Sequence, residues 1–209
     1  MLATCFAIAF SMLLAPPANG ELRKELLEMQ RKDQAARAAM LQAFEQHGIR
    51  FETGKPVTEP QKLAVVLEEA KKLKEIDAVH TERMKEILKK HGWPGKALVG
   101  IDGAHAAWLL VQHADSDSKF QEQCLKLMQK APKGEVDPKD IAYLTDRVLV
   151  AAGKPQRYGT QLRADFQPMP IEDESQVDQR RTAIGLPPLA EYLKTAYEDF
   201  KKMSQAPRK

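Results

Sequence analysis

The chain has 209 residues, of which 43% are hydrophobic and 29% charged, enough for one domain with a substantial core but too little for two. Its 32 basic and 29 acidic side chains are interspersed and leave a net charge of +3. Because no basic face stands out, binding to nucleic acid is not expected.

The first twenty residues carry no charged side chain. An apolar run from Leu2 to Ala15 is followed by two prolines and then by Ala18-Asn19-Gly20. This pattern predicts a signal peptide over residues 1–20, although the usual basic residues at its start are missing. The run is short for a membrane span, so we expect no stable span after its removal and a periplasmic or secreted protein.

The chain contains two cysteines, Cys5 and Cys124. Cys5 lies in the segment expected to be removed, so no intramolecular disulfide can form in the rest of the chain. No neighbouring charge activates Cys124, which is expected to pack as a small hydrophobic side chain.

The remaining residues, 21–209, are predicted to form a single all-α domain. Apolar residues spaced by three, four and seven predict a long helix over 21–47 that ends at Gly48. A second long helix is expected from Pro60 to about Lys90, and the two should pair as an antiparallel hairpin.

The rest of the chain predicts a multi-helix bundle built against this hairpin. The stretch Gly103–Ala114 is apolar nearly all round and should be a buried central helix. The further elements expected are helices over 117–130, 137–152, 176–183 and 188–203, with an irregular loop or short β-hairpin near 154–171.

Polar residues interrupt the apolar stripes of both long helices. Asp33 falls on the stripe of the first, and Asp77 and His80 fall on that of the second. Burying a carboxylate is costly unless it is paired, so these positions predict partners or a wet cavity. Together with further polar residues on the later helices they suggest a polar pocket walled by four helices; those residues are His105, Gln112, His113, Asp146 and Arg147. The plainer alternative for Asp33 is an ion pair with Arg37 one turn away.

The sequence carries no standard catalytic or metal-binding template. His113, Asp115 and Asp117 alternate as metal ligands can, but the segment lacks the glycine and terminal glutamate of a calcium loop. Asp117 is also well placed to cap the next helix. No metal and no cofactor are therefore expected.

Four short motifs occur in order along the chain. They are His91-Gly92-Trp93-Pro94, Gln112-His113-Ala114-Asp115, Leu144-Thr145-Asp146-Arg147, and Gln156 followed by Tyr158-Gly159-Thr160-Gln161. The ordered set resembles a bacterial domain family of unknown function, number 6624, over about residues 33–192. The resemblance implies no activity, but it groups the 158–161 segment with the helical motifs and suggests a loop folded over a pocket mouth. The matching positions are Trp93, Gln112, His113, Asp146, Arg147, Gln156, Tyr158, Thr160, Gln161 and Asp173.

Three functions remain open. The first is a hydrolytic or group-transferring enzyme in which a histidine moves a proton, an arginine holds an anionic group and water is the nucleophile. The second is a non-catalytic envelope module that binds a small polar or anionic ligand or a peptide end. The third is a buried polar network that only fixes the fold. The candidate catalytic residues are His91, His113, Asp146 and Arg147, and the candidate binding residues are Asp33, Asp77, Trp93, Gln112, Gln156, Tyr158, Thr160, Gln161 and Arg180.

Overall fold

A computed structural model describes residues 16–50 and 56–205, with side chains up to residue 201. Within these residues it contains seven α-helices, one short 3-10 helix and no β-strand, so the predicted all-α class is confirmed. The predicted signal peptide lies for the most part, over residues 1–15, outside the described residues.

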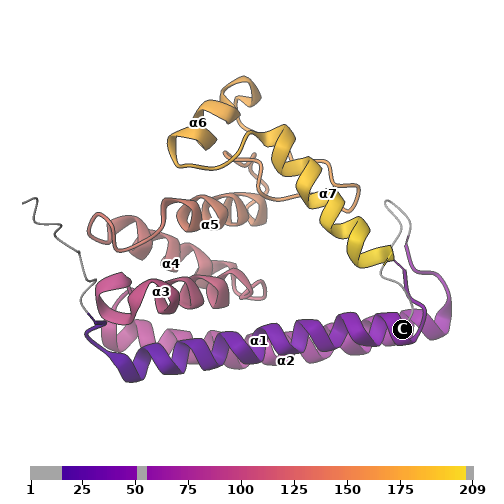
Figure 1. Ribbon diagram of the computed structural model, residues 1–209, viewed down its shortest axis with the longest axis horizontal. Helices are drawn as coiled ribbons and strands as arrows, with labels where there is room; N and C mark the ends of the chain where they lie inside the picture. Colours follow the sequence, from indigo (N-terminus) through magenta and orange to yellow (C-terminus); the bar gives the residue numbers. More distant parts are fainter. Residues whose placement is uncertain (1–15, 51–55, 206–209) are drawn as a thin grey trace, which may run out of the picture.

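The two long helices form the base of the molecule (Figure 1). α1 spans Gly20–Gln46 and α2 spans Pro60–His91, and they pack against each other. Asn19 caps α1 by accepting a hydrogen bond from the Leu22 amide, and Pro60 opens α2, where its missing N–H costs nothing. Gly92 ends α2 with a φ of 69°, a left-handed conformation that favours glycine.

Three shorter helices stack on one half of this hairpin (Figure 1). They are α3 (Lys96–Gln112), α4 (Ser118–Lys130) and α5 (Pro138–Ala151). α3 contacts both long helices, and its buried side chains, such as Val99, Leu110 and Val111, form the centre of the core. It starts earlier than the predicted Gly103, because a break at Gly100, with a φ of 76°, joins an additional N-terminal turn to it.

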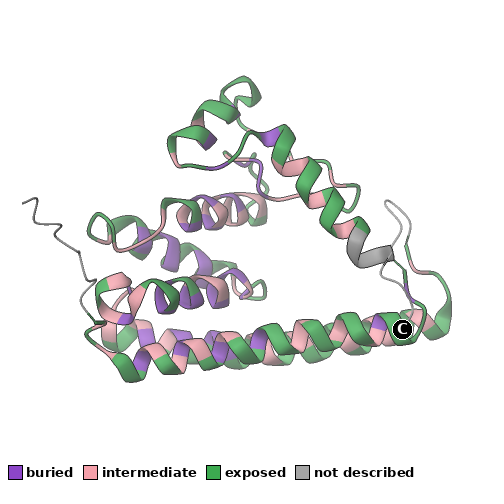
Figure 2. Ribbon diagram, viewed as in Figure 1, coloured by how far each residue is buried: buried purple, intermediate pink, exposed green. Residues whose placement is uncertain are grey.

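Burial is uneven along the hairpin (Figure 2). Leu26, Met84 and Ile87, which lie under α3, are almost fully buried. Leu41, Leu63 and Leu67, which lie in the half that α3 does not cover, are exposed. The covered half therefore anchors the core, and polar residues near the middle of α1 and α2 lie at its edge.

The C-terminal third is less regular. Residues 152–173 contain only two isolated β-bridges, Gln156 with Ile171 and Leu162 with Pro168, so the segment is the loop rather than the hairpin of the two forms expected. A 3-10 helix η1 (Glu174–Gln176) and α6 (Val177–Ala183) follow on the far side of α5 from the hairpin, and α7 (Leu189–Gln205) slants back from there toward the uncovered end of the hairpin (Figure 1). An edge-to-face contact between Tyr143 of α5 and Tyr192 of α7 joins the two parts.

The described chain includes residues on the N-terminal side of the domain boundary expected at residue 20. The backbone amides of Ala18 and Asn19 donate hydrogen bonds to the carbonyls of Ala97 and Leu98. None of the helices in the described ranges is both long and apolar enough to cross a membrane.

Candidate functional site

A polar cluster lies where α3 ends against the middle of the hairpin. It consists of Asp33 and Arg37 from α1, Asp77 from α2 and His113 from the residue after α3, and we call it the Asp–Arg–His cluster. Asp33 and Asp77 interrupt the apolar stripes of the two long helices. In the structure both residues lie close to His113.

The closest contact in the cluster joins Asp33 and His113. Their Oδ1 and Nδ1 atoms are 2.9 Å apart, and Asp33 is 1% exposed whereas the His113 side chain is 22% exposed. Because an ionised carboxylate can only accept, we assign the Nδ1 proton to His113. The 3.2 Å approach of Arg37 Nε to the same Nδ1 would require the opposite tautomer, and we favour the shorter contact with the carboxylate. Nε2 of His113 is then the unprotonated nitrogen, and it has no partner among the described residues.

Arg37 joins the two carboxylates of the cluster. Its Nη2 donates to Asp77 Oδ1 at 2.7 Å and to Asp33 Oδ1 at 3.2 Å. Burial alone would raise the pKa of Asp33, but hydrogen bonds from His113 and Gln34 and the charge of Arg37 outweigh it and lower that pKa. For Asp77 burial is the stronger effect, so its pKa is raised despite Arg37. The pKa values of the two carboxylates that share one guanidinium are thus shifted in opposite directions.

The cluster has the donor atoms of a small metal site. One atom each of Asp33, Asp77 and His113 lies within 4.8 Å of the others. The guanidinium of Arg37 contacts all three of these side chains and already supplies the compensating positive charge. Arg37 is therefore the centre of the cluster.

His80 lies one turn beyond Asp77 on α2. It is 6% exposed, and its Nδ1 has no hydrogen-bond partner. Burial lowers the pKa of His80, which keeps the ring neutral, although the charges of Asp33 and Asp77 act in the opposite direction.

A second polar group surrounds the last residues of α3. Arg147 of α5 donates from Nε to Gln112 Oε1 at 2.7 Å and from Nη1 to Asp115 Oδ1 at 2.6 Å. Gln121 of α4 donates to the carbonyls of Val111 and Gln112 and to Asp115. Two of the expected site residues, Gln112 and Arg147, are thus brought together beside the Asp–Arg–His cluster.

Asp146 does not reach this cluster. It is 0% exposed and accepts hydrogen bonds from the backbone amides of Arg157, Tyr158 and Thr160 and from the Thr160 hydroxyl, at 2.7–3.2 Å. All of its accepting capacity is used to hold the irregular segment, so no oxygen is free for a substrate. The residues expected to wall one pocket therefore fall into separate groups, and the contacts of Asp146 hold the irregular segment.

Gln156, Gln161, Thr160 and Tyr158 also serve the irregular segment. The Gln156 side chain donates to the Gln161 and Met169 carbonyls and accepts from the Gln161 amide. The Gln161 side chain donates to the Thr160 hydroxyl. These contacts match the third hypothesis, a satisfied internal network, for this part of the chain.

Neighbouring arginines have different surroundings. Arg180, expected to hold an anion, donates instead to the backbone carbonyls of Arg157, Glu172 and Asp173. Arg181 is 0% exposed, donates to the Tyr158 and Pro187 carbonyls and lies over the Tyr192 ring. Burial lowers the pKa of Arg181.

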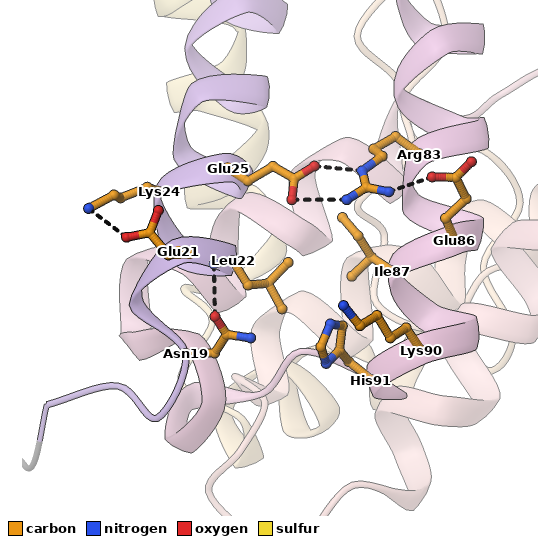
Figure 3. A pocket seen from close by; sticks show the side chains of 10 residues that line it. All are labelled: Asn19, Glu21, Leu22, Lys24, Glu25, Arg83, Glu86, Ile87, Lys90 and His91. Atoms are coloured by element: carbon orange, nitrogen blue, oxygen red, sulfur yellow. Dashed lines mark hydrogen bonds and ion pairs between the residues drawn. The ribbon is translucent and has the colours of Figure 1, made fainter.

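His91 and Trp93 lie away from the Asp–Arg–His cluster. His91 lines a cavity of about 530 Å³ between the start of α1 and the end of α2, where it lies near Asn19 and Lys90 (Figure 3). Trp93 packs against the core and lines a smaller cavity of about 100 Å³ with His105 and Asp140. Neither residue can act together with His113 in this arrangement.

The sequence did not single out Arg37 or Arg181 as site or buried residues. Arg37 carried a signal, because it lies four residues after Asp33 and was recognised as its possible ion-pair partner. For Arg181 the sequence offered none, since it stands beside an equally basic Arg180 in a short polar helix. Asp173, which the resemblance added, has a φ of 43° and accepts from Arg180 through its carbonyl.

Comparison with known proteins identifies a family but no activity. A family model described as a family of unknown function, DUF6624, matches residues 20–203, which confirms the family expected from the motifs. No curated protein and no solved structure matches the chain.

Proposed function

We propose, from its own geometry, that the chain is an exported hydrolytic or group-transferring enzyme. It belongs to the DUF6624 family, whose function is unknown. His113 is the residue that moves the proton, and Asp33 positions it. Water is the nucleophile, since the hydrogen-bond partners of His113 among the described residues include no serine or cysteine.

The Asp33–His113 hydrogen bond carries this proposal. A buried carboxylate that accepts from Nδ1 fixes both the tautomer and the orientation of the ring, and it stabilises the imidazolium formed when Nε2 takes a proton. His113 is partly exposed whereas Asp33 is buried, so Nε2 is the atom through which the pair can reach a substrate.

Cys124 supports the choice of water as nucleophile. The thiol is buried, and burial raises its pKa to about 12, so it is almost entirely protonated at neutral pH. It cannot serve as an attacking thiolate.

Export is the second part of the proposal and rests on the uncharged apolar segment from Leu2 to Ala15 and the small residues after it. In a bacterial host the full chain should be recovered outside the cytoplasm without this segment. Cell fractionation followed by N-terminal sequencing tests this, and an uncut chain in the cytoplasmic fraction would contradict it.

The catalytic part is tested by turnover of a panel of ester, amide, phosphoester and glycoside substrates. His113→Gln should lower kcat by about 10²- to 10⁴-fold, the usual contribution of a general acid or base. Asp33→Asn should lower kcat with little change in KM, because it disturbs the orientation of the ring rather than substrate contacts. His47→Gln, at the exposed end of α1, is the matched control and should turn over normally.

Full turnover by His113→Gln would overturn the catalytic proposal. A chain that binds a member of the panel through His113 without converting it would instead be the envelope binding module. Circular dichroism of each variant separates loss of chemistry from loss of fold.

A further inference from the structure

Gln112 is buried with only half of its amide in use. The residue is 4% exposed, its Oε1 accepts from Arg147, and its Nε2 has no hydrogen-bond partner. A buried amide donor without an acceptor is unfavourable. Neighbouring atoms cover Nε2, so a ligand oxygen meets it once these atoms shift.

The orientation of this amide is fixed by chemistry. Arg147 can only donate, so the atom of Gln112 that faces its Nε must be the carbonyl oxygen. The free atom of Gln112 is therefore the NH₂ group. Rotating the amide by 180° would place two donors against each other and leave an acceptor unpaired.

Arg147 has a free donor on the same edge. Nε and Nη2 of a guanidinium form one side of a rigid planar fork. Nε is used by Gln112 and Nη1 by Asp115, whereas Nη2 has no partner among the described residues. The side chain is 29% exposed, so solvent or a ligand can reach it.

Two nearby acceptors, both backbone carbonyls, already have a donor. The Gln121 amide covers the last carbonyls of α3, those of Val111 and Gln112, which would otherwise accept from the free donors nearby. Within the part of the chain that the structure describes, Asp115 is the one carboxylate in contact with Arg147, and its side chain is 64% exposed. It neutralises part of the guanidinium charge and competes with any incoming anion.

We infer that Gln112 Nε2 and Arg147 form an anion subsite that takes a carboxylate or phosphoryl oxygen of the substrate. The subsite lies at the end of α3, and His113 is the next residue in the sequence. The inference rests on the proposed function, in which the bound anion is part of the substrate. The anionic oxygen accepts from the amide and pairs with the guanidinium.

The test follows the Gln112 side-chain amide by ¹⁵N NMR, with its signals assigned by their loss in Gln112→Glu. Inorganic phosphate and acetate are titrated separately into the full chain. At least one of them should shift these signals in a saturable manner, and the arm that binds more tightly identifies phosphoryl or carboxylate chemistry.

Two variants make the result specific. Gln112→Glu preserves an oxygen for Arg147, so the unfolding midpoint should not fall, but it replaces the free donor with a negative charge. Affinity for the binding anion should drop at least tenfold. Asp115→Asn removes the competing carboxylate and should strengthen binding by about two- to fivefold, the range expected for an exposed ion pair.

Two results would overturn the subsite: no shift of the Gln112 amide with either anion, or unchanged anion affinity in Gln112→Glu. The failure of the proposed function looks different. In that case anion binding depends on Gln112 as described, but His113→Gln retains full turnover.

Discussion

Arg37 is the residue on which the Asp–Arg–His cluster depends. It donates to Asp33 and Asp77, two carboxylates from different helices that would repel each other without it. Asp33 is almost fully buried, so an uncompensated charge there would be poorly solvated. The ion pair thus makes it possible to place a carboxylate beside His113 inside the protein.

Arg37→Met should therefore destabilise the chain although it adds apolar surface. Removing one partner of a fully buried ion pair costs about 3–5 kcal/mol, and partial exposure of Arg37 and Asp77 reduces the expected loss to about 2 kcal/mol. Urea unfolding at neutral pH measures it. Adding Asp77→Asn to the same chain should restore part of the loss, and an Arg37→Met variant as stable as the parent would refute this view.

Asp140 provides a pH-dependent contribution away from the cluster. Burial raises its pKa to about 6, although His105, 3.5 Å away, acts to lower it. An unfolded chain has an aspartate pKa near 4, so the folded state binds this proton more tightly. The stability that the proton adds is fully present below about pH 4 and is lost as the pH rises through about 6.

Asp140→Asn should remove this loss. The variant should be about 2 kcal/mol more stable than the parent at pH 8 and similar to it at pH 4, as measured by urea unfolding at both values. Adding His105→Gln to the parent chain should widen the difference between the two pH values. A gain in stability of equal size at pH 4 and pH 8 would show that the titration of Asp140 is not its cause.

At the scale of an element, Asp146 fixes the conformation of the irregular segment between α5 and α6 through hydrogen bonds. Three backbone amides and one hydroxyl of residues 157–160 converge on its two oxygens. The backbone hydrogen bonds of the segment, such as Gln156 to Pro170 and Met169 to Gln161, leave the amides of residues 157, 158 and 160 to this carboxylate.

Asp146→Asn should loosen this segment more than the helices. One acceptor becomes a donor that faces other donors, which costs about 2–4 kcal/mol. Hydrogen exchange of the amides in residues 156–171 should accelerate, while those of α1 and α2 under α3 remain protected. Uniform acceleration over the whole chain would mean that the segment and the hairpin unfold as one unit.

The sequence predicted the helices better than their starting points. The capping residue Asp117 and prolines such as Pro60 and Pro138 mark helix starts chemically, so those boundaries agree closely with the structure. The start of α3 was missed because Gly100 breaks the helix without ending it, and periodicity cannot detect such a break. The sequence does not decide between a loop and a short β-hairpin for residues 154–171, because the hydrogen bonds to Asp146 leave no mark in the local sequence pattern.

For the whole molecule, the sequence indicated which residues are unusual but not which of them meet. Asp33, Asp77 and His113 stood out singly, and three separate helices had to pack before they became one cluster. Asp146 and Arg147 are adjacent in sequence, yet they face different surroundings, the irregular segment and Gln112. Neighbours on a helix point in different directions, so a motif cannot tell a residue that serves the fold from one that serves a site.

The uncovered half of the hairpin places the Asp–Arg–His cluster at an edge rather than in the centre of the protein (Figure 2). Asp33 is buried under the end of α3, whereas Arg37 and Asp77 are partly exposed.

The most direct test of the central claim, that the end of α3 is a functional site, is a ligand screen read by melting temperature. The full chain, His113→Gln and Gln112→Glu are screened in parallel against peptidoglycan fragments, nucleotides, sugar phosphates and small carboxylates. A ligand at a hundred times its Kd adds about 2.7 kcal/mol of stability. We predict a ligand that raises the melting temperature of the parent and fails to do so in both variants, whose own folds stay intact. A ligand that stabilises all three chains equally, or variants that melt early and bind nothing because they have lost their fold, would contradict the claim and assign the cluster to structure alone.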